Sequence, residues 1–216
     1  MTFNVKEALT SLKNAAASAV VCPQWQGIIV DLCNYLVDQE HFQTWTATSR
    51  HNAHHYGDGG LIVHTHEVVL SCIVVRRLYP QHEIDEAELF LSALYHDAGK
   101  MWDYERTDII SPDDPRACTE INREFYGWQA TTHKRKIHHI SRSALVWSKA
   151  LDEVGVPSNF RKDYEDAVLH AILAHHGQRA WGSPVAPKSR VSWLLHLCDG
   201  ISARLYDADT LDIVKN

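Results

Sequence analysis

The sequence predicts an all-α protein, a helical bundle that carries one small β-hairpin or lid around residues 101–130. Three observations lead to this fold class. Apolar residues recur at helical spacing through most of the chain. Glycine and proline stand mainly between the segments that have this spacing. Between residues 101 and 130 the spacing changes to an alternation of polar and apolar side chains, which is typical of short strands.

Two helices are expected before residue 50, and neither carries a ligand motif. The first is expected over residues 3–20, where apolar residues recur every three or four positions. Pro23 suits the first turn of a second helix that runs to about Gln39. A polar, histidine-rich stretch follows over residues 44–60, and its closing glycines indicate a turn.

Five further helices are expected in the rest of the chain. They run from Leu61 to Leu78, from Ile84 to Ala98, from Lys136 to Val154, from Asn159 to His176 and from Arg190 to Tyr206. The first of these is apolar on several faces, as a central buried helix would be. Gly99 and Gly177 are placed to end two of the helices, since glycine is favoured just past a helix C-terminus. The hairpin or lid turns at Ser111–Pro115, and residues 180–188 form an exposed connector.

The composition excludes several classes of protein. Apolar residues make up 45% of the 216 residues and charged residues 22%, which is ordinary for one globular domain. No run approaches the roughly 18 apolar residues of a membrane helix, and the first residues lack a signal-peptide layout. The five cysteines are scattered, so we expect a protein of the reducing cytoplasm. The net charge of -6 disfavours a broad nucleic-acid surface.

Histidine is the outlier of the composition, with 15 residues, and histidines gather with two aspartates at five places. In chain order these places are His64, His96-Asp97, His138-His139, His175-His176 and Asp199. Imidazole and carboxylate groups together are typical ligands of divalent transition metals. Each place alone has an ordinary explanation, such as a core histidine or a helix end. The five together predict a metal centre.

The dyad His96-Asp97 is the middle of this predicted centre. Neighbouring residues at a helix end point about 100° apart, so His96 can bind one metal while Asp97 reaches inward. A carboxylate has two oxygens and can bridge two cations. One expected four-ligand site consists of His64, His96, Asp97 and Asp199. The second would add His139, His175 and His176 to the bridging Asp97. Such ligands favour Fe, Mn, Zn or Ni, with Mg left open.

The motifs resemble those of the HD-domain superfamily of metal-dependent phosphohydrolases, and their framing is similar to the HD domain of YhaM-type bacterial 3′–5′ exoribonucleases. The matching stretches are His54–Tyr56, Gly59–Thr65, His96–Lys100, His138–Ile140, Ala174–Gln178, Gly182–Val185 and Leu195–Arg204. The resemblance implies an all-helical HD-domain fold with the metals in the bundle centre, and hydrolysis of phosphate esters. It implies the same seven ligands, with His139 rather than His138 at the family's histidine-isoleucine step, although the doubled histidine leaves that choice open.

The resemblance also bears on domains and substrate. We expect one HD domain over residues 1–216, with residues 1–50 as a helical scaffold and residues 51–206 as the metal-binding core. YhaM-type exoribonucleases carry an N-terminal oligonucleotide-binding barrel, but the first 50 residues here lack a strand-rich pattern. We therefore expect no dedicated nucleic-acid-binding domain and a small phosphorylated substrate, such as a nucleotide or short oligonucleotide. A 3′–5′ exonuclease acting on longer nucleic acid is the alternative, and a homo-oligomer stays open.

Four residues beside the motifs are candidates for substrate binding. Lys100 would point into the site and bind a phosphate oxygen. We expect Asp97 and Lys100 to be the catalytic residues. The alternative for Lys100 is a surface lysine. Arg204 offers a fork for phosphate, or else a surface salt bridge. His54 and His55 would donate to phosphate or protonate the leaving group, or else be ordinary loop histidines.

Two other functions compete with hydrolysis. The HD fold also hosts mixed-valence di-iron oxygenases, which use a similar set of histidines and aspartates. A non-catalytic nucleotide sensor is the other alternative, although a sensor has no need of an intact ligand set.

Overall fold

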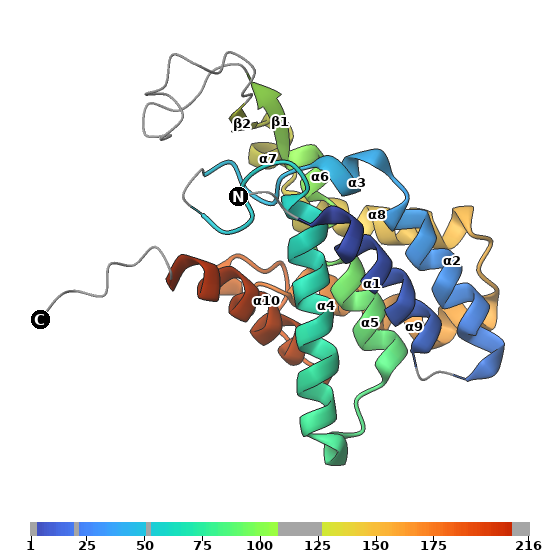
Figure 1. Ribbon diagram of the computed structural model, residues 1–216. Coiled ribbons are helices and arrows are strands. Elements are labelled where there is room, and N and C mark those ends of the chain that lie inside the picture. Colours follow the sequence, from blue (N-terminus) through green and yellow to red (C-terminus); the bar gives the residue numbers. More distant parts are fainter. Residues whose placement is uncertain (1–3, 20–21, 51–52, 108–126, 209–216) are drawn as a thin grey trace, which may run out of the picture.

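The computed structural model describes residues 4–19, 22–50, 53–107 and 127–208, and it confirms the all-α fold class (Figure 1). The long helices are α1 (Val5–Ser18), α2 (Gln26–Val37), α4 (Gly60–Leu78), α5 (Glu86–Tyr95), α8 (His139–Glu153), α9 (Ser158–Ala174) and α10 (Arg190–Ala208). The short helices are α3 (Glu40–Thr44), α6 (Lys100–Asp103) and α7 (Thr132–Lys136). Single 3-10 turns are η1 (Pro23–Trp25), η2 (Pro80–His82) and η4 (Arg179–Trp181). In the part of the chain that is described, no helix is both long and apolar enough to span a bilayer.

The predicted hairpin is present at one end of the bundle, beside α6 and α7 (Figure 1). Strands β1 (Tyr104–Thr107) and β2 (Gly127–Ala130) are antiparallel, with Tyr104 opposite Ala130. The buried Trp128 meets Trp45 edge-on at 5.1 Å, and the Trp45 indole donates to the Tyr104 carbonyl at 2.8 Å. The hairpin is thereby fixed to the bundle. Its expected turn at Ser111–Pro115 lies outside the described residues.

Helix α4 is the element around which the others are arranged. It packs against α1, α5 and α10, and α9 packs in turn against α5 and α8 (Figure 1). The fully buried side chains of this core include Leu32, Leu61, Leu91 and Trp147. The predicted N-terminal helices join the same core through contacts of α1 with α4 and of α2 with α5.

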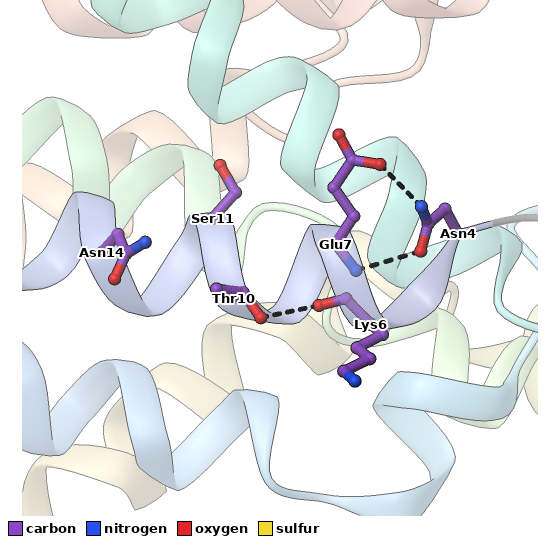
Figure 2. A pocket seen from close by; sticks show the side chains of 6 residues that line it. All are labelled: Asn4, Lys6, Glu7, Thr10, Ser11 and Asn14. Atoms are coloured by element: carbon purple, nitrogen blue, oxygen red, sulfur yellow. Dashed lines mark hydrogen bonds between the residues drawn. The ribbon is translucent and has the colours of Figure 1, made fainter.

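Helix α1 begins two residues later than expected, at Val5, because Asn4 caps it. The Asn4 side chain accepts from the Glu7 backbone N–H at 3.1 Å and so satisfies one donor of the first turn. Figure 2 shows the hollow along this polar face, which is lined by Asn4 and by residues of α1. Its lining side chains are Asn4, Lys6, Glu7, Thr10, Ser11 and Asn14.

Helix α4 has the central position expected of it, although Leu70, Val74 and Leu78 are exposed. One expectation about helices is wrong in detail. Helix α5 ends at Tyr95 rather than near Ala98, and Gly99 has a φ of -66°, so it is not a left-handed helix cap. The reason for glycine there is tertiary: a Cβ would overlap the carbonyl oxygen at the start of α8.

Candidate metal centre

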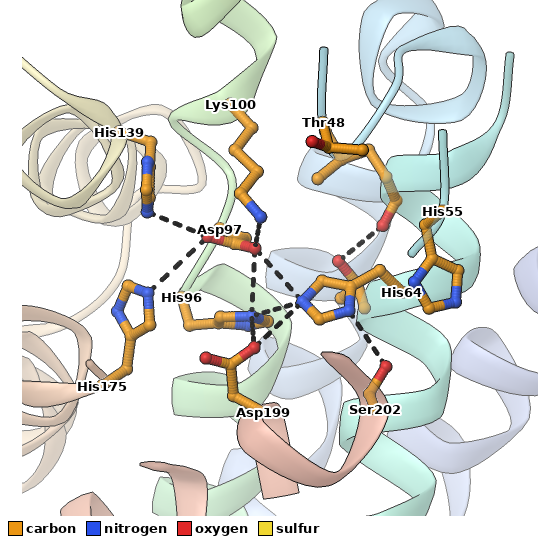
Figure 3. Close-up of polar contacts among 12 residues, drawn as sticks. Thr48, His55, His64, His96, Asp97, Lys100, His139, His175, Asp199 and Ser202 are labelled. Atoms are coloured by element: carbon orange, nitrogen blue, oxygen red, sulfur yellow. Dashed lines mark hydrogen bonds and ion pairs between the residues drawn. The ribbon is translucent and has the colours of Figure 1, made fainter. Parts of the chain in front are cut away.

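The predicted ligands converge where α4, α5, α8, α9 and α10 meet (Figure 3). By helix they are His64 in α4, His96 and Asp97 directly after α5, His139 at the start of α8, His175 and His176 directly after α9, and Asp199 in α10. Residues from 64 to 199 are thus brought into one cluster, as the motif order predicts.

The position of the dyad follows from how α5 ends. The buried Tyr95 hydroxyl donates to the Leu32 carbonyl at 2.7 Å, and the Tyr95 ring meets the Trp147 ring at 5.1 Å. These contacts fix the last turn of α5 against α2 and α8. The Gly99 N–H donates to the Ser143 hydroxyl at 2.8 Å, which holds the other side of the dyad against α8.

The first group of ligand atoms lies around one oxygen of Asp97. Asp97 Oδ2 is 3.2 Å from His64 Nε2 and 3.4 Å from His96 Nε2. Asp199 Oδ1 is 3.1 Å from His64 Nε2 and 3.8 Å from His96 Nε2. All four residues offer ligand atoms within 4.8 Å of one another, a spacing that a single metal ion can span.

The second group lies around the other oxygen of Asp97. Asp97 Oδ1 is 3.4 Å from His139 Nε2 and 3.6 Å from His175 Nε2. His176 Nε2 is 3.3 Å from His139 Nε2, which brings the third histidine into the group. The two oxygens of one carboxylate therefore face two different groups of histidines.

Two buried atoms of the cluster show that these residues fit a metal. Asp97 Oδ1 and His175 Nε2 have no hydrogen-bond partner among the described residues, although both are fully enclosed. A buried carboxylate oxygen without a partner is costly, unless a cation binds it. The donor set of imidazole nitrogens and carboxylate oxygens is the one that divalent transition metals prefer.

The histidine rings are held with one nitrogen free to face the centre. His96 Nδ1 and His175 Nδ1 lie 2.7 Å from the carbonyls of Ala93 and Ile172. A carbonyl only accepts, so each Nδ1 carries the proton and each Nε2 presents its lone pair inward. His64 is oriented in the same sense, since its Nδ1 lies 3.0 Å from the Ser202 hydroxyl.

Two orienting groups were missed by the sequence reasoning. Asp103 Oδ2 lies 3.0 Å from His139 Nδ1, and its Oδ1 lies 3.2 Å from His133 Nδ1. The Ser202 hydroxyl donates to Glu67 at 2.8 Å, which leaves its oxygen to accept from His64. One signal was available for Ser202, because it stands three residues after Asp199 on the same face of a helix.

The charges of the cluster suit metal binding. Burial alone would raise the pKa of Asp97, but the charge of Lys100 holds it well below its ordinary range. Burial lowers the pKa of His139 to about 4, even though Asp103 acts in the opposite direction. Burial also lowers the pKa of His175 well below its ordinary value. Ionised carboxylates and neutral imidazoles are the forms that bind metal.

Lys100 is not the surface lysine that was the alternative. It is only 9% exposed, and its Nζ lies 2.5 Å from Asp97 Oδ2 (Figure 3). Burial would lower the pKa of Lys100, but the charge of Asp97 raises it above its ordinary value, so the ammonium stays charged.

The other candidate residues surround a cleft that opens onto the centre. The cleft has a volume of about 660 Å³, and His54, Lys100, His138 and Arg204 are among its lining residues. His55 lies behind it, with Nε2 3.0 Å from Glu67. Of the candidate residues outside the two ligand groups, only His55 does not line the cleft.

His138 and His139 differ in where their rings lie. Both residues line the cleft, but only the Nε2 of His139 approaches Asp97; the His138 ring lies tilted against the His139 ring, with 4.1 Å between centroids. The geometry favours His139 as the ligand, in agreement with the motif.

Fold and site together define a helical protein with a buried histidine and aspartate cluster that suits divalent metal. The chain belongs to the HD domain family, whose family model matches residues 61–204.

The chain is also similar to curated bacterial proteins. The chain is 27% identical over 170 residues to the 3′-5′ exoribonuclease YhaM of Oceanobacillus iheyensis, a match that covers 77% of this chain and 44% of that protein. It is 30% identical over 169 residues to the protein of the same name from Listeria monocytogenes serotype 4b, covering 77% and 45%. The chain thus spans less than half the length of these relatives. No solved structure gives a significant match.

Proposed function

We propose that this chain hydrolyses phosphate esters of nucleotides or short oligonucleotides at a two-metal centre. One observation carries the proposal: the two oxygens of the buried Asp97 face two separate groups of histidines, with the ammonium of Lys100 beside them. Carboxylate-bridged metal pairs of this kind are suited to displacement at phosphorus.

The proposed ligands follow the two groups of atoms. One ion would be held by His64, His96, Asp97 and Asp199. The second would be held by Asp97, His139, His175 and His176. The donor chemistry supports Fe, Mn, Zn or Ni, and Mg stays open. When bound, such ions supply a Lewis acid and a hydroxide nucleophile at neutral pH.

The remaining residues would bind and orient the substrate. Lys100 stays protonated and would donate to a non-bridging phosphate oxygen, where negative charge develops during displacement. Arg204 would bind a phosphate from the rim of the cleft through its fork of N–H groups. Burial, with the charge of Lys100, lowers the pKa of His54 to about 3, so its ring would donate a hydrogen bond rather than a proton. His55 contacts Glu67 and does not line the cleft, so any effect of His55 on the substrate would be indirect.

The test is hydrolysis by the purified protein with Mn²⁺ of a panel of nucleoside monophosphates, cyclic nucleotides and short oligonucleotides. We expect the wild type to release phosphate or nucleotide, and Asp97→Asn to lose at least about 100-fold in rate while staying folded. Asp163→Asn, at an exposed position in α9, is the matched control and should keep full activity. An Asp97→Asn protein as active as the wild type would contradict the proposal.

The alternatives give different products in the same panel. The curated relatives are named 3′-5′ exoribonucleases, which favours a second candidate, stepwise shortening of longer RNA from its 3′ end. Oxygen consumption with Fe²⁺ and no release of phosphate would indicate the di-iron oxygenase instead. Nucleotide binding without turnover would indicate the sensor.

We also propose that residues 1–216 form one domain, since α1 and α2 share the core of the ligand-bearing helices. Cys22, Cys33, Cys72 and Cys198 are free thiols, which supports action in a reducing cytoplasm. Light scattering would show whether the chain is a monomer or a homo-oligomer.

A further inference from the structure

An exposed tryptophan stands at the mouth of the cleft, and the proposed hydrolysis does not use it. Trp181 ends the turn η4 and lines the cleft together with His54, Lys100 and Arg204. It is 59% exposed, although one face of its indole stacks on the His196 ring, with 5.6 Å between centroids and 24° between planes. A large apolar ring is thus held flat against one neighbour while the rest of its surface stays open.

The pair of rings is built closely into the segment that bears two proposed ligands. His196 Nδ1 bonds to the His175 carbonyl at 2.9 Å. Gly177 has a φ of +89°, and a Cβ there would come within 2.6 Å of Trp181 and 2.7 Å of His196. Only glycine at this position lets both rings lie against the backbone. The orientation of the indole is therefore fixed relative to His175.

The rest of the cleft has the features of a nucleotide site. Its volume of about 660 Å³ lies in the range of small-ligand pockets, which is about 300–1,000 Å³. The cleft is also lined by Arg50, Lys134 and Arg204, in addition to Lys100. Cationic side chains therefore gather at the cleft, although the whole chain has a net charge of -6. Flat aromatic rings beside cationic groups are the usual surface for stacked bases and their phosphates.

We propose that Trp181 and His196 form a base-stacking platform, on which a nucleobase of the substrate rests while its phosphate lies beside Asp97 and Lys100. This inference rests on the proposed function and narrows it. Phosphate esters that carry a base would be the substrates, and esters without one would be poor substrates. Stacking is tolerant of base identity, so we expect little preference among the four bases.

The platform is tested by comparing a short oligoribonucleotide with an oligomer of the same length whose residues are abasic. Trp181→Ala should lower kcat/KM for the oligoribonucleotide by about 5- to 150-fold, the range expected for loss of one stacked base, and leave the abasic oligomer unchanged. Trp181→Phe should restore most of the loss, because it keeps a flat ring. Trp193→Ala is the matched control, because Trp193 also contacts the His196 ring, at 6.1 Å, but does not line the cleft.

A binding measurement separates this inference from the proposed function. Adenosine 5′-monophosphate should quench the tryptophan fluorescence of the wild type and of Trp193→Ala, but much less that of Trp181→Phe, and ribose 5-phosphate should quench none of them. If the protein shows no turnover but its fluorescence quenching depends on Trp181, the base-stacking platform is supported and the proposed hydrolytic activity is contradicted. Equal losses on both oligomers, or quenching independent of Trp181, would overturn the platform and leave the hydrolysis standing.

Discussion

Each histidine that faces Asp97 turns its other ring nitrogen toward a fixed partner, and these partners differ in kind. His96 and His175 use backbone carbonyls, whereas His139 uses the carboxylate of Asp103. A carboxylate raises the basicity of the ring and fixes its tautomer more strongly than a carbonyl does. If His139 is a ligand, as proposed, the side chain of Asp103 would therefore influence how strongly it binds metal.

Asp103→Asn should lower metal affinity by about 10- to 100-fold, the usual cost of losing such a partner. The amide has one accepting oxygen for its two neighbouring rings, His133 and His139, and it carries no negative charge to raise the basicity of His139. Titration calorimetry with Mn²⁺ measures the change. Asp58→Asn, which affects only an exposed pair with Arg106, should leave the affinity as it is. Equal affinities in all three proteins would show that Asp103 does not position His139.

Lys100→Met should reduce kcat by about 100-fold or more while the protein keeps its metal. Methionine has a similar length and keeps the buried contacts, but it provides no donor for a phosphate oxygen. Steady-state kinetics and metal analysis of the same preparation check both parts. A variant that loses its metal along with its activity would show instead that Lys100 maintains the charge balance of the cluster.

At the scale of elements, the centre depends on the close approach of α5 and α8. Gly99 lies at this contact, and its conformation is one that any residue can adopt. What excludes a side chain is the carbonyl of His139, which would overlap a Cβ. The two helix ends carry proposed ligands of both groups, so the distance between these ends sets the distance from Asp97 to His139.

Gly99→Ala should destabilise the fold by about 1–3 kcal/mol and lower the metal content, because α8 must move away from α5. Gly27→Ala is the matched control: it lies inside α2 with nothing near its Cβ, so it should stabilise by about 0.5–1 kcal/mol. Urea unfolding and metal analysis measure both variants. A Gly99→Ala protein as stable as the wild type and with full metal content would show that α8 can shift to accommodate a side chain at residue 99 without cost.

The sequence predicted most elements of the fold and much of the cluster, and the gaps have a common cause. Spacing along the chain carries information on helices and on His96-Asp97, because these depend on local periodicity. The hairpin was also predictable, since alternation marks strands. The reason for Gly99, the exposure of Leu70 and the role of Asp103 depend on which helix lies opposite, and spacing within one element does not carry that information.

At the scale of the whole molecule, the proposed ligands tie together helices that are distant in sequence. His64 and Asp199 belong to α4 and α10, which also pack against each other. A ligand that binds only the folded state stabilises it by mass action. The stability of the bundle and the occupancy of the centre are therefore coupled.

Addition of Mn²⁺ at about 100 times its dissociation constant should stabilise the fold by about 2.7 kcal/mol, which raises the melting temperature by about 5–10 °C for a chain of this size. A chelator should reverse the shift. Asp199→Ala should melt at the same temperature with and without the ion. Melting curves that do not respond to metal in the wild type would contradict a bound ion in the bundle.

The order of the ligands along the chain determines when the centre can exist during protein synthesis. Translation delivers His64 early and Asp199 last of the seven, so a nascent chain has an incomplete set until α10 leaves the ribosome. An ion that meets the growing polypeptide earlier finds histidines without their second carboxylate. A centre that uses all seven proposed ligands could therefore be completed only after α10 has been synthesised.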